Sequence, residues 1–144
     1  MAVLIDLYDT AYLNDIAVVS FSMNQAEALS VMDDEGNCYI ALDSKKLKSE
    51  TDEIVKLAHD LGHCITGAFY NRYSKLDSIS QKEYRANKWA VHKIIPFHKL
   101  QEAFDQGIIE KWELAEYFEV TEDFIETALL VYRNEGALEA SASS

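Results

Sequence analysis

Hydrophobic residues follow two different patterns along the chain, and the first of them predicts strands. Residues 16–42 contain three short runs rich in β-branched, aromatic and other apolar residues, "IAVVSFSM", "ALSVM" and "CYIAL". The last two runs flank "DDEGN", a cluster of residues typical of a tight turn. We therefore expect a small antiparallel sheet of about three strands.

The second pattern is a helical period that begins near residue 49. Apolar residues recur at helical spacing over about 49–70 and form one stripe: Ile54, Leu57, Ala58, Leu61, Ile65 and Ala68. Ser49, with Asp52 three residues later, resembles a capping box at the start of this helix. On a helical wheel His59 and His63 fall roughly opposite the stripe. Their imidazoles should project together, because residues four apart share a face.

Further helices are expected in the second half of the chain. A helical pattern over about 80–95 ends at Pro96, which cannot continue a helix. Three shorter helical patterns follow, "FHKLQEAFDQG", "EKWELAEYF" and "TEDFIETALLVYR", the last with Thr121 as its N-cap. We expect the α+β fold class, with the sheet packed against a helix bundle. It should form a single domain over residues 1–135, followed by a disordered tail over residues 136–144.

Charge narrows the class of partner. The 144 residues include 25 acidic and 13 basic side chains, which gives a formal net charge of -12. Nucleic acids normally bind to a basic surface, so direct binding of nucleic acid is not expected. An acidic surface suits a basic protein partner instead. The sequence does not fix the oligomeric state.

The N-terminal segment and the number of cysteines indicate the cellular compartment of the protein. The first residues lack the basic region of a signal peptide, and no apolar run reaches the ~18 residues of a membrane span. We therefore expect a cytoplasmic protein without a membrane segment. The chain has two cysteines, Cys38 and Cys64, which are too few for a disulfide framework. We expect reduced thiols, as is usual in the cytosol.

The candidate chemistry lies in "HDLGH", residues 59–63. Two histidines one helical turn apart can bind one zinc ion, and a carboxylate beside the first can exchange protons with the attacking water of a zinc peptidase. For a third ligand we favour Glu83, early in the next helix, over Asp77, Glu102 and Cys64, provided that the two helices pack antiparallel. The same spacing also occurs in helices that simply carry two surface or half-buried histidines. Spacing alone therefore leaves both interpretations open.

Four other side chains have weaker claims to a role in such a site. His92 or His98 could donate a proton to a tetrahedral intermediate, and a phenol at Tyr70 or Tyr73 could stabilise an oxyanion. Surface and packing roles are the commoner use of such residues.

The motifs, in this order and spacing, resemble the ImmA/IrrE-type metallo-endopeptidases, which are small gluzincin-like proteins of bacteria, phages and mobile elements. The resemblance rests on "LAHDLGHC", "EYRANKWAVHKIIP" and "ELAEYFEVTEDFIETAL". It implies a zincin-like fold, zinc held by His59, His63 and Glu83, and Asp60 as the general base. It also implies the substrate, a helix-turn-helix repressor of the Xre type that the enzyme cleaves or inactivates.

Two residues depart from that family pattern and keep alternatives open. Asp60 stands where the family usually has glutamate, and Arg85 replaces the second acid of its "E-x-E-A" motif. The shorter Asp60 side chain can fall short of the water, and a misplacement of ~1 Å can cost about 100-fold in rate. The alternative is therefore a catalytically weak or inactive metal-binding module that binds a repressor without cutting it. A DNA-binding regulator is a more distant reading, because eight acids from Asp105 to Glu126 face only Lys111.

Overall fold

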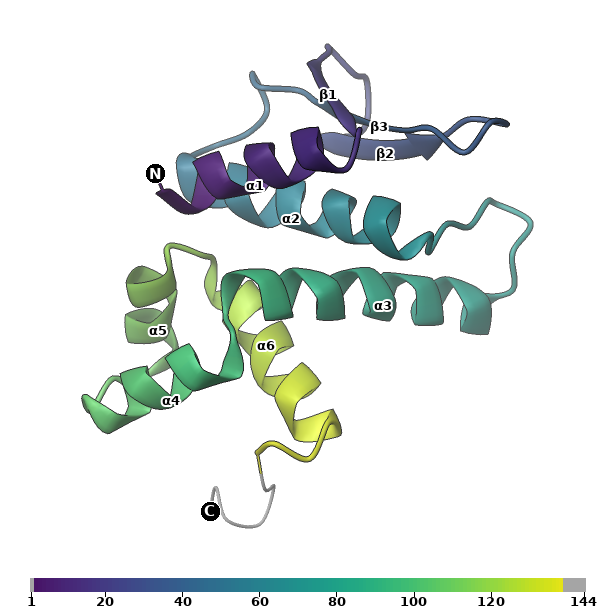
Figure 1. Ribbon diagram of the computed structural model, residues 1–144. Coiled ribbons are helices and arrows are strands. Elements are labelled where there is room, and N and C mark those ends of the chain that lie inside the picture. Colours follow the sequence, from purple (N-terminus) through teal and green to yellow (C-terminus); the bar gives the residue numbers. More distant parts are fainter. Residues whose placement is uncertain (1, 139–144) are drawn as a thin grey trace. The chain divides into compact units, whose positions relative to one another are not determined.

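The computed structural model describes residues 2–138 and folds them into helices and a three-stranded sheet (Figure 1). The elements are, in chain order, α1 (Ala2–Leu13), β1 (Ala17–Ser20), β2 (Ala28–Met32), β3 (Cys38–Leu42), α2 (Glu50–Thr66), α3 (Leu76–Ile94), α4 (Phe97–Asp105), α5 (Lys111–Phe118) and α6 (Glu122–Asn134). The expected α+β class is confirmed. The elements divide into two compact units, Met1–Ala90 and Val91–Ser144.

The sheet of the first unit has the order β1-β3-β2, with β3 in the centre. β2 pairs antiparallel with β3, from Ala28 opposite Leu42 to Met32 opposite Cys38, as the turn sequence between them predicts. β1 pairs parallel with β3, so the expectation of a purely antiparallel sheet is wrong for this strand. The reason is the connection over residues 21–27, which carries the chain from one edge of the sheet to the other instead of closing a hairpin.

Helix α2 is the buried centre of the first unit. It contacts α1, β2 and β3, and it lies between the sheet and α3 (Figure 1). Five residues of the predicted apolar stripe are fully buried: Ile54, Leu57, Ala58 and Leu61 within the helix, and Ala68 just after it. Ser49 caps the start of the helix by accepting the N–H of Asp52 at 3.2 Å, and Gly67 ends it in the left-handed conformation, at φ 70°. The first three turns of α2 are thus anchored by apolar packing.

Helix α1 is an element that the sequence patterns did not predict. Its Leu7 and Ala11 are buried, and the helix contacts α2 and β1. Ile5, Tyr12 and Leu13 are exposed on the same helix. Because apolar side chains occur on both its buried and its exposed sides, no single stripe marks this segment as an amphipathic helix.

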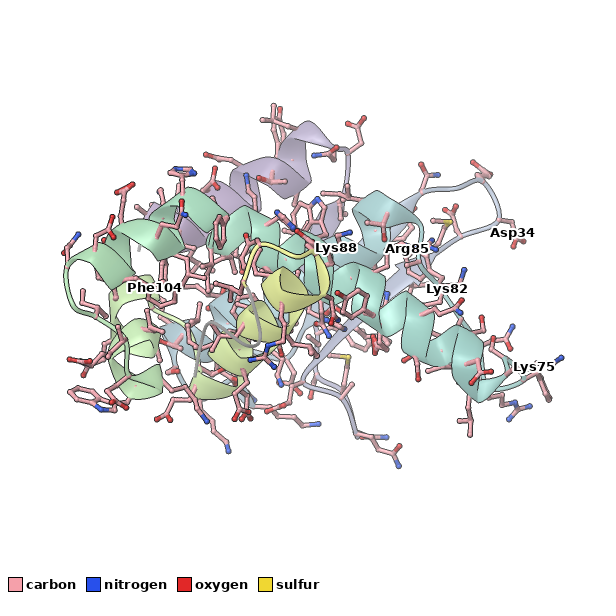
Figure 2. The ribbon with its side chains drawn as sticks, turned by 90° about the horizontal axis from the view of Figure 1, so that it is seen from below. Asp34, Lys75, Lys82, Arg85, Lys88 and Phe104 are labelled. Atoms are coloured by element: carbon pink, nitrogen blue, oxygen red, sulfur yellow. A yellow bond between two sulfur atoms is a disulfide. The ribbon has the colours of Figure 1, made fainter. Side chains whose placement is uncertain are left out.

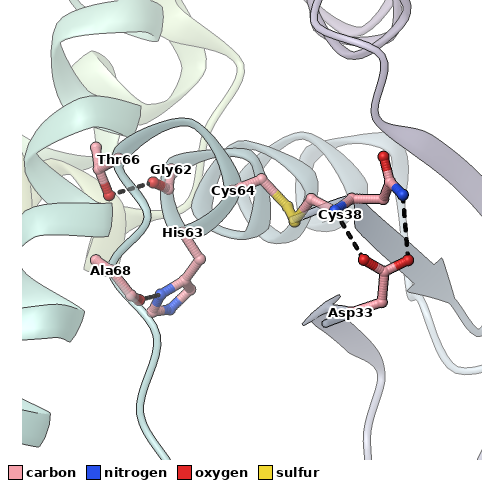
Figure 3. The surroundings of a disulfide bond; sticks show 8 residues. Asp33, Cys38, Gly62, His63, Cys64, Thr66 and Ala68 are labelled. Atoms are coloured by element: carbon pink, nitrogen blue, oxygen red, sulfur yellow. Dashed lines mark hydrogen bonds between the residues drawn. A yellow bond between two sulfur atoms is a disulfide. The ribbon is translucent and has the colours of Figure 1, made fainter. Parts of the chain in front are cut away.

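A disulfide joins Cys38, the first residue of β3, to Cys64 in α2 (Figure 3). The two Cα atoms lie 5.9 Å apart, within the usual range for a disulfide. The expectation of reduced thiols is therefore wrong for this structure. The pairing follows from the packing of α2 on β3, which brings together residues 26 apart in sequence. A count of cysteines does not reveal that contact.

The second unit contains the end of α3 and the helices α4, α5 and α6. Its buried apolar residues include Leu100, Ala103, Leu114, Phe118, Phe124, Ile125, Ala128 and Val131. Thr121 caps α6 as predicted, accepting the N–H of Phe124 at 3.1 Å. The buried hydroxyl of Tyr132 donates to the carbonyl oxygen of Ile95 at 2.5 Å, which fixes α6 to the residue that follows α3.

Two expectations about the organisation of the chain stay predictions. A single domain over residues 1–135 is neither supported nor contradicted by compact units alone. The predicted tail over residues 136–144 lies outside the described residues from position 139 onward. Within the described part of the chain, no helix is long and apolar enough to cross a membrane.

Candidate metal centre

Helix α2 places His59, Asp60 and His63 on its less apolar side. The side chain of His59 is 27% exposed and that of His63 is 8% exposed, so the pair lies at the wall of a cavity rather than on an open surface. The two Nε2 atoms are 3.1 Å apart. Because the two histidines are one helical turn apart, their Nε2 atoms lie next to each other, as the spacing predicts.

Glu83 of α3 meets the two histidines. Its Oε2 lies 3.0 Å from Nε2 of His59 and 2.8 Å from Nε2 of His63. Among the described residues, these three side chains are the group of histidine, cysteine or acidic residues whose ligand atoms converge closely enough to hold one metal ion. The structure thus brings together the three residues expected to bind zinc.

The approach of α3 to α2 depends on Gly62. A Cβ atom at this position would lie 2.3 Å from the carbonyl oxygen of Ala86 and 2.9 Å from its Cα. These are backbone atoms of α3, which a change of side-chain rotamer cannot move. The glycine in "HDLGH" therefore sets the helix separation at which Glu83 can reach the histidines.

Hydrogen bonds on the far side of each imidazole determine where its proton lies. Nδ1 of His59 faces Oδ1 of Asn87 at 2.7 Å, and Nδ1 of His63 faces the carbonyl oxygen of Ala68 at 2.5 Å. Both partners are acceptors, so each Nδ1 must carry the proton. In a neutral imidazole, Nε2 then carries a lone pair and no proton. Two nitrogen lone pairs and a carboxylate oxygen consequently face one another with no proton between them.

A divalent cation satisfies this arrangement better than protons do. If both Nε2 atoms donated a hydrogen bond to the Glu83 carboxylate, both imidazoles would have to be doubly protonated, which would set two positive charges side by side. Two histidines and one glutamate are instead a donor set that zinc uses in catalytic sites, where a fourth position is left to water. Two bonds of ~2.0–2.2 Å to one ion place donor atoms roughly 3–4 Å apart, near the separations found here.

Asp60 lies beside this donor set and is buried, with 6% of its surface exposed. Burial raises the pKa of its carboxyl group to about 6, against the opposing effects of His59, His63 and a hydrogen bond from the Ser30 side chain. Its Oδ2 is the one buried side-chain polar atom among the described residues that has no hydrogen-bond partner. A buried acceptor without a donor is costly and marks a place where a water or ligand proton belongs.

A cavity of about 280 Å³ opens over the donors. It is lined by Ala28, Leu29 and Ser30 of β2, by Phe69 and Tyr70 after α2, and by the four site residues. β2 is an edge strand, so one side of its backbone has no partner strand. The Tyr70 hydroxyl donates to Oε1 of Glu83 at 3.1 Å. Burial and the charge of Glu83 raise the pKa of Tyr70, so this phenol stays protonated in the cavity.

Tyr70 is thus the one weaker candidate that lies at the site, and the others lie elsewhere. His92 in the second unit contacts Glu135 at 2.8 Å, and Tyr73 is 79% exposed. Cys64 is bonded to Cys38, and neither Asp77 nor Glu102 belongs to the cluster. Arg85, which stands at the second acid of the family motif, is exposed and projects from α3 with Lys82 and Lys88 (Figure 2). It takes no part in the ligand set.

Sequence reasoning missed the residues that position the ligands. Asn87 follows Glu83 by four residues, so the same helical spacing that paired the histidines signals that it shares the Glu83 face. Gly62 in the middle of an otherwise strong helix is a similar signal for close packing. The carbonyl group of Ala68 and the hydroxyl group of Ser30 carry no local signal, because their places depend on the turn after α2 and on the sheet.

Comparison with protein families identifies the chain. The peptidase M78 model, described as the IrrE N-terminal-like domain, matches residues 14–130. The chain belongs to this family. The matched region of the M78 domain includes every residue of the cluster and begins just after α1. Comparisons with curated proteins and with solved structures find no match. Family membership assigns the chain a peptidase-type domain, and the cluster gives that domain a possible metal site.

Proposed function

We propose that the chain is a zinc-dependent endopeptidase that acts in the cytoplasm on a helix-turn-helix repressor of the Xre type, as part of a phage or other mobile element. The observation that carries the proposal is the convergence of three ligand atoms, the two Nε2 atoms and Oε2 of Glu83, within 3.1 Å of one another. Both Nδ1 atoms donate outward, to Asn87 and Ala68, so that both Nε2 atoms face the carboxylate of Glu83 as acceptors.

His59, His63 and Glu83 would hold the ion, and bound zinc polarises a carbonyl and lowers the pKa of water to about 7. Asp60 is the group placed to take a proton from the attacking water and pass it to the leaving amine. In the metal-free protein burial raises its pKa to about 6, which is the direction that a general base working near neutral pH needs. The Tyr70 hydroxyl, which lines the same cavity, is a second proton donor beside the scissile group.

The cavity wall formed by β2 supports a peptide substrate. Ala28, Leu29 and Ser30 line the cavity on an edge strand, whose free backbone groups can pair with an extended segment of another chain. An endopeptidase needs its substrate extended, and pairing with the strand would hold it that way above the donors. The net charge of -12 is compatible with a repressor that is basic on its DNA-binding face.

Zinc content tests the proposal directly. We expect freshly purified protein to contain about one zinc per chain, and His63→Ala to contain almost none. His92→Ala, which removes a histidine outside the cluster, should retain the full content. A metal-free wild type that takes up no zinc on titration would remove the proposed centre.

The alternative, a metal-holding module that binds a repressor without cleaving it, is favoured by the shortness of Asp60. Co-expression with a helix-turn-helix repressor of the Xre type, followed by mass spectrometry, separates the two functions. Defined fragments that disappear in His63→Ala show cleavage, whereas capture of the intact repressor by both proteins supports the binding module. Asp60→Glu then measures the cost of the missing methylene. A large gain in cleavage would mean that the native base is impaired.

A further inference from the structure

We propose that Cys38 and Cys64 form a thiol–disulfide exchange site, and that its oxidised state tightens the metal centre. The proposal rests on the proposed function, since it needs an ion at His59, His63 and Glu83. It starts from the position of the bond, which joins the first residue of β3 to the residue that follows His63 (Figure 3).

The apolar anchoring of α2 ends before His63 is reached. The last fully buried apolar residue of the helix is Leu61, and Ile65 is only half-buried. In the following segment, Gly67 and residues 70–73 are exposed, and only Ala68 is buried. A helix end with little apolar burial opens at low cost. The disulfide at Cys64 therefore adds a covalent link between this end of α2 and the sheet.

The turn held by the bond also positions His63. The carbonyl oxygen of His63 accepts the N–H of Ala68 at 3.1 Å, and the carbonyl oxygen of Ala68 in turn accepts the Nδ1 proton of His63. The side chain of Thr66 closes the same turn by donating to the carbonyl oxygen of Gly62 at 2.7 Å (Figure 3). Loosening the turn thus loosens both the ligand and the acceptor that fixes its proton.

On the other side, the bond holds the strands of the cavity wall. Cys38 pairs with Met32 of β2, and the same strand lines the cavity with Ala28, Leu29 and Ser30. The hairpin between Met32 and Cys38 is fixed by Asp33, whose carboxylate accepts the N–H of Asn37 at 2.9 Å. The disulfide therefore connects a well-ordered strand pair to the less anchored end of the ligand helix.

The chemistry needs only a low-molecular-weight disulfide such as oxidised glutathione. Cys64 is half-buried while Cys38 is 7% exposed, so exchange begins at Cys64. Its thiolate attacks one sulfur of the small disulfide, forms a mixed disulfide and releases one thiolate. The thiolate of Cys38 then attacks Sγ of Cys64 and releases the second. Two cysteine thiols are oxidised, one small disulfide is reduced to two thiols, and excess small thiol reverses both steps.

Because the two sites are coupled, each must affect the other equally. If the disulfide raises zinc affinity, zinc must stabilise the disulfide by the same factor. Loss of a group that orients a ligand typically lowers metal affinity by about 10–100-fold, and we expect reduction to do the same at the lower end of that range. For a two-electron couple, a tenfold difference in affinity corresponds to a shift of about 30 mV in midpoint potential.

The test is a redox titration of the full chain in glutathione buffers, with the oxidised fraction measured by alkylation and mass spectrometry. It is run once without metal and once at a buffered concentration of free zinc that saturates both the oxidised and the reduced form. We expect zinc to lower the midpoint potential by at least about 30 mV. An unchanged midpoint would overturn the proposal. A raised midpoint would overturn it as well, because it would mean that zinc binds to the free thiols of the reduced form.

Two variants make the result specific. The midpoint of His63→Ala should not respond to zinc, and a response there would show that zinc acts outside the cluster. Cys38→Ser/Cys64→Ser should bind zinc with the weaker affinity of the reduced wild type, and the affinity of the oxidised form would contradict the proposal. Should the double variant fail to fold, the comparison of oxidised with reduced wild type still decides. Zinc binding by neither form would remove the proposed function as well, whereas equal binding by both would remove only this inference.

Discussion

Gly62 and Ala86 form the contact that sets the distance between α2 and α3. A methyl group on Gly62 would lie 2.3 Å from the carbonyl oxygen of Ala86, which belongs to the backbone of the facing helix. The three proposed ligands come from these two helices, so the separation of the helices determines whether their donor atoms meet.

Gly62→Ala should therefore lower both stability and metal affinity. Helix propensity alone would favour alanine by ~1 kcal/mol, so a glycine without this contact would give a more stable protein. We expect the opposite sign, a loss in the upper part of the ~1–3 kcal/mol typical of overpacking, because the backbone of α3 must move. Urea unfolding of the metal-free protein measures the first effect, and zinc titration should show at least a tenfold loss of affinity. A gain in stability would contradict the close contact.

The role of Asn87 can be tested through its acceptor atom. Asn87→Ala removes the partner of His59 Nδ1 and should weaken zinc binding by about 10–100-fold. Asn87→Asp keeps an acceptor in place and should retain most of the affinity. Arg85→Ala, an exposed change on the same helix, serves as the control. The measurement is competition for zinc with a chromophoric chelator, and equal affinities for all four proteins would remove Asn87 from the centre.

The buried Asp60 makes the stability of the metal-free protein depend on pH. Burial raises its pKa from 3.8 to about 6, so between these values the folded protein binds a proton that the unfolded chain has lost. The free energy of unfolding should fall as pH rises through this window, by up to about 3 kcal/mol. Asp60→Asn should remove that slope and be the more stable protein at pH 7. Urea unfolding from pH 4.5 to 7.5 in a chelator compares the two, and parallel curves would refute the raised pKa.

With zinc present, the same variant separates chemistry from binding. Asp60→Asn leaves all three donors in place and should hold zinc as the wild type does. Its kcat on a cleaved repressor should fall by at least about 100-fold, the lower end of what general acid–base catalysis contributes. Wild-type kcat in a zinc-loaded Asp60→Asn protein would show that another group carries the proton.

Tyr132→Phe tests the second unit. The change removes the hydrogen bond to the carbonyl oxygen of Ile95 and leaves that buried acceptor without its donor, at a cost of about 1–3 kcal/mol. Hydrogen exchange should accelerate for amides in α4, α5 and α6. Zinc affinity should not change, because the donors all belong to the first unit. A matching loss of zinc would mean that the two units unfold together.

Local patterns predicted most of the elements but few of their contacts. The strand runs, the ligand helix and the caps at Ser49 and Thr121 were readable because each depends on neighbours within one or two turns. The direction of β1 was not, since it depends on which edge of the sheet residues 21–27 reach. The disulfide was missed for a similar reason. Its cysteines meet only once α2 has packed on β3.

The candidate centre was predictable where residues share a helical face. The pairing of His59 with His63 followed from their spacing. The choice of Glu83 as third ligand followed from an assumed antiparallel packing of the two helices and from the family resemblance. The acceptors behind the imidazoles were not foreseen, because one is an amide on another helix and the other is the carbonyl oxygen of Ala68 after a left-handed turn. The reach of Asp60 toward the water depends on a side chain that is one methylene shorter than glutamate. A pattern of residue types carries no information on a distance of that size.

The division of the chain into two units has an evolutionary consequence. All the groups described at the centre, from Ser30 to Asn87, belong to the first unit, so no substitution in α4, α5 or α6 replaces one of them. Substitutions in those helices are therefore constrained by the folding of the second unit and not by the need to keep the three proposed ligands. Across divergent descendants of this chain, the stretch from β2 to the middle of α3 should change slowly, while the helices after it diversify.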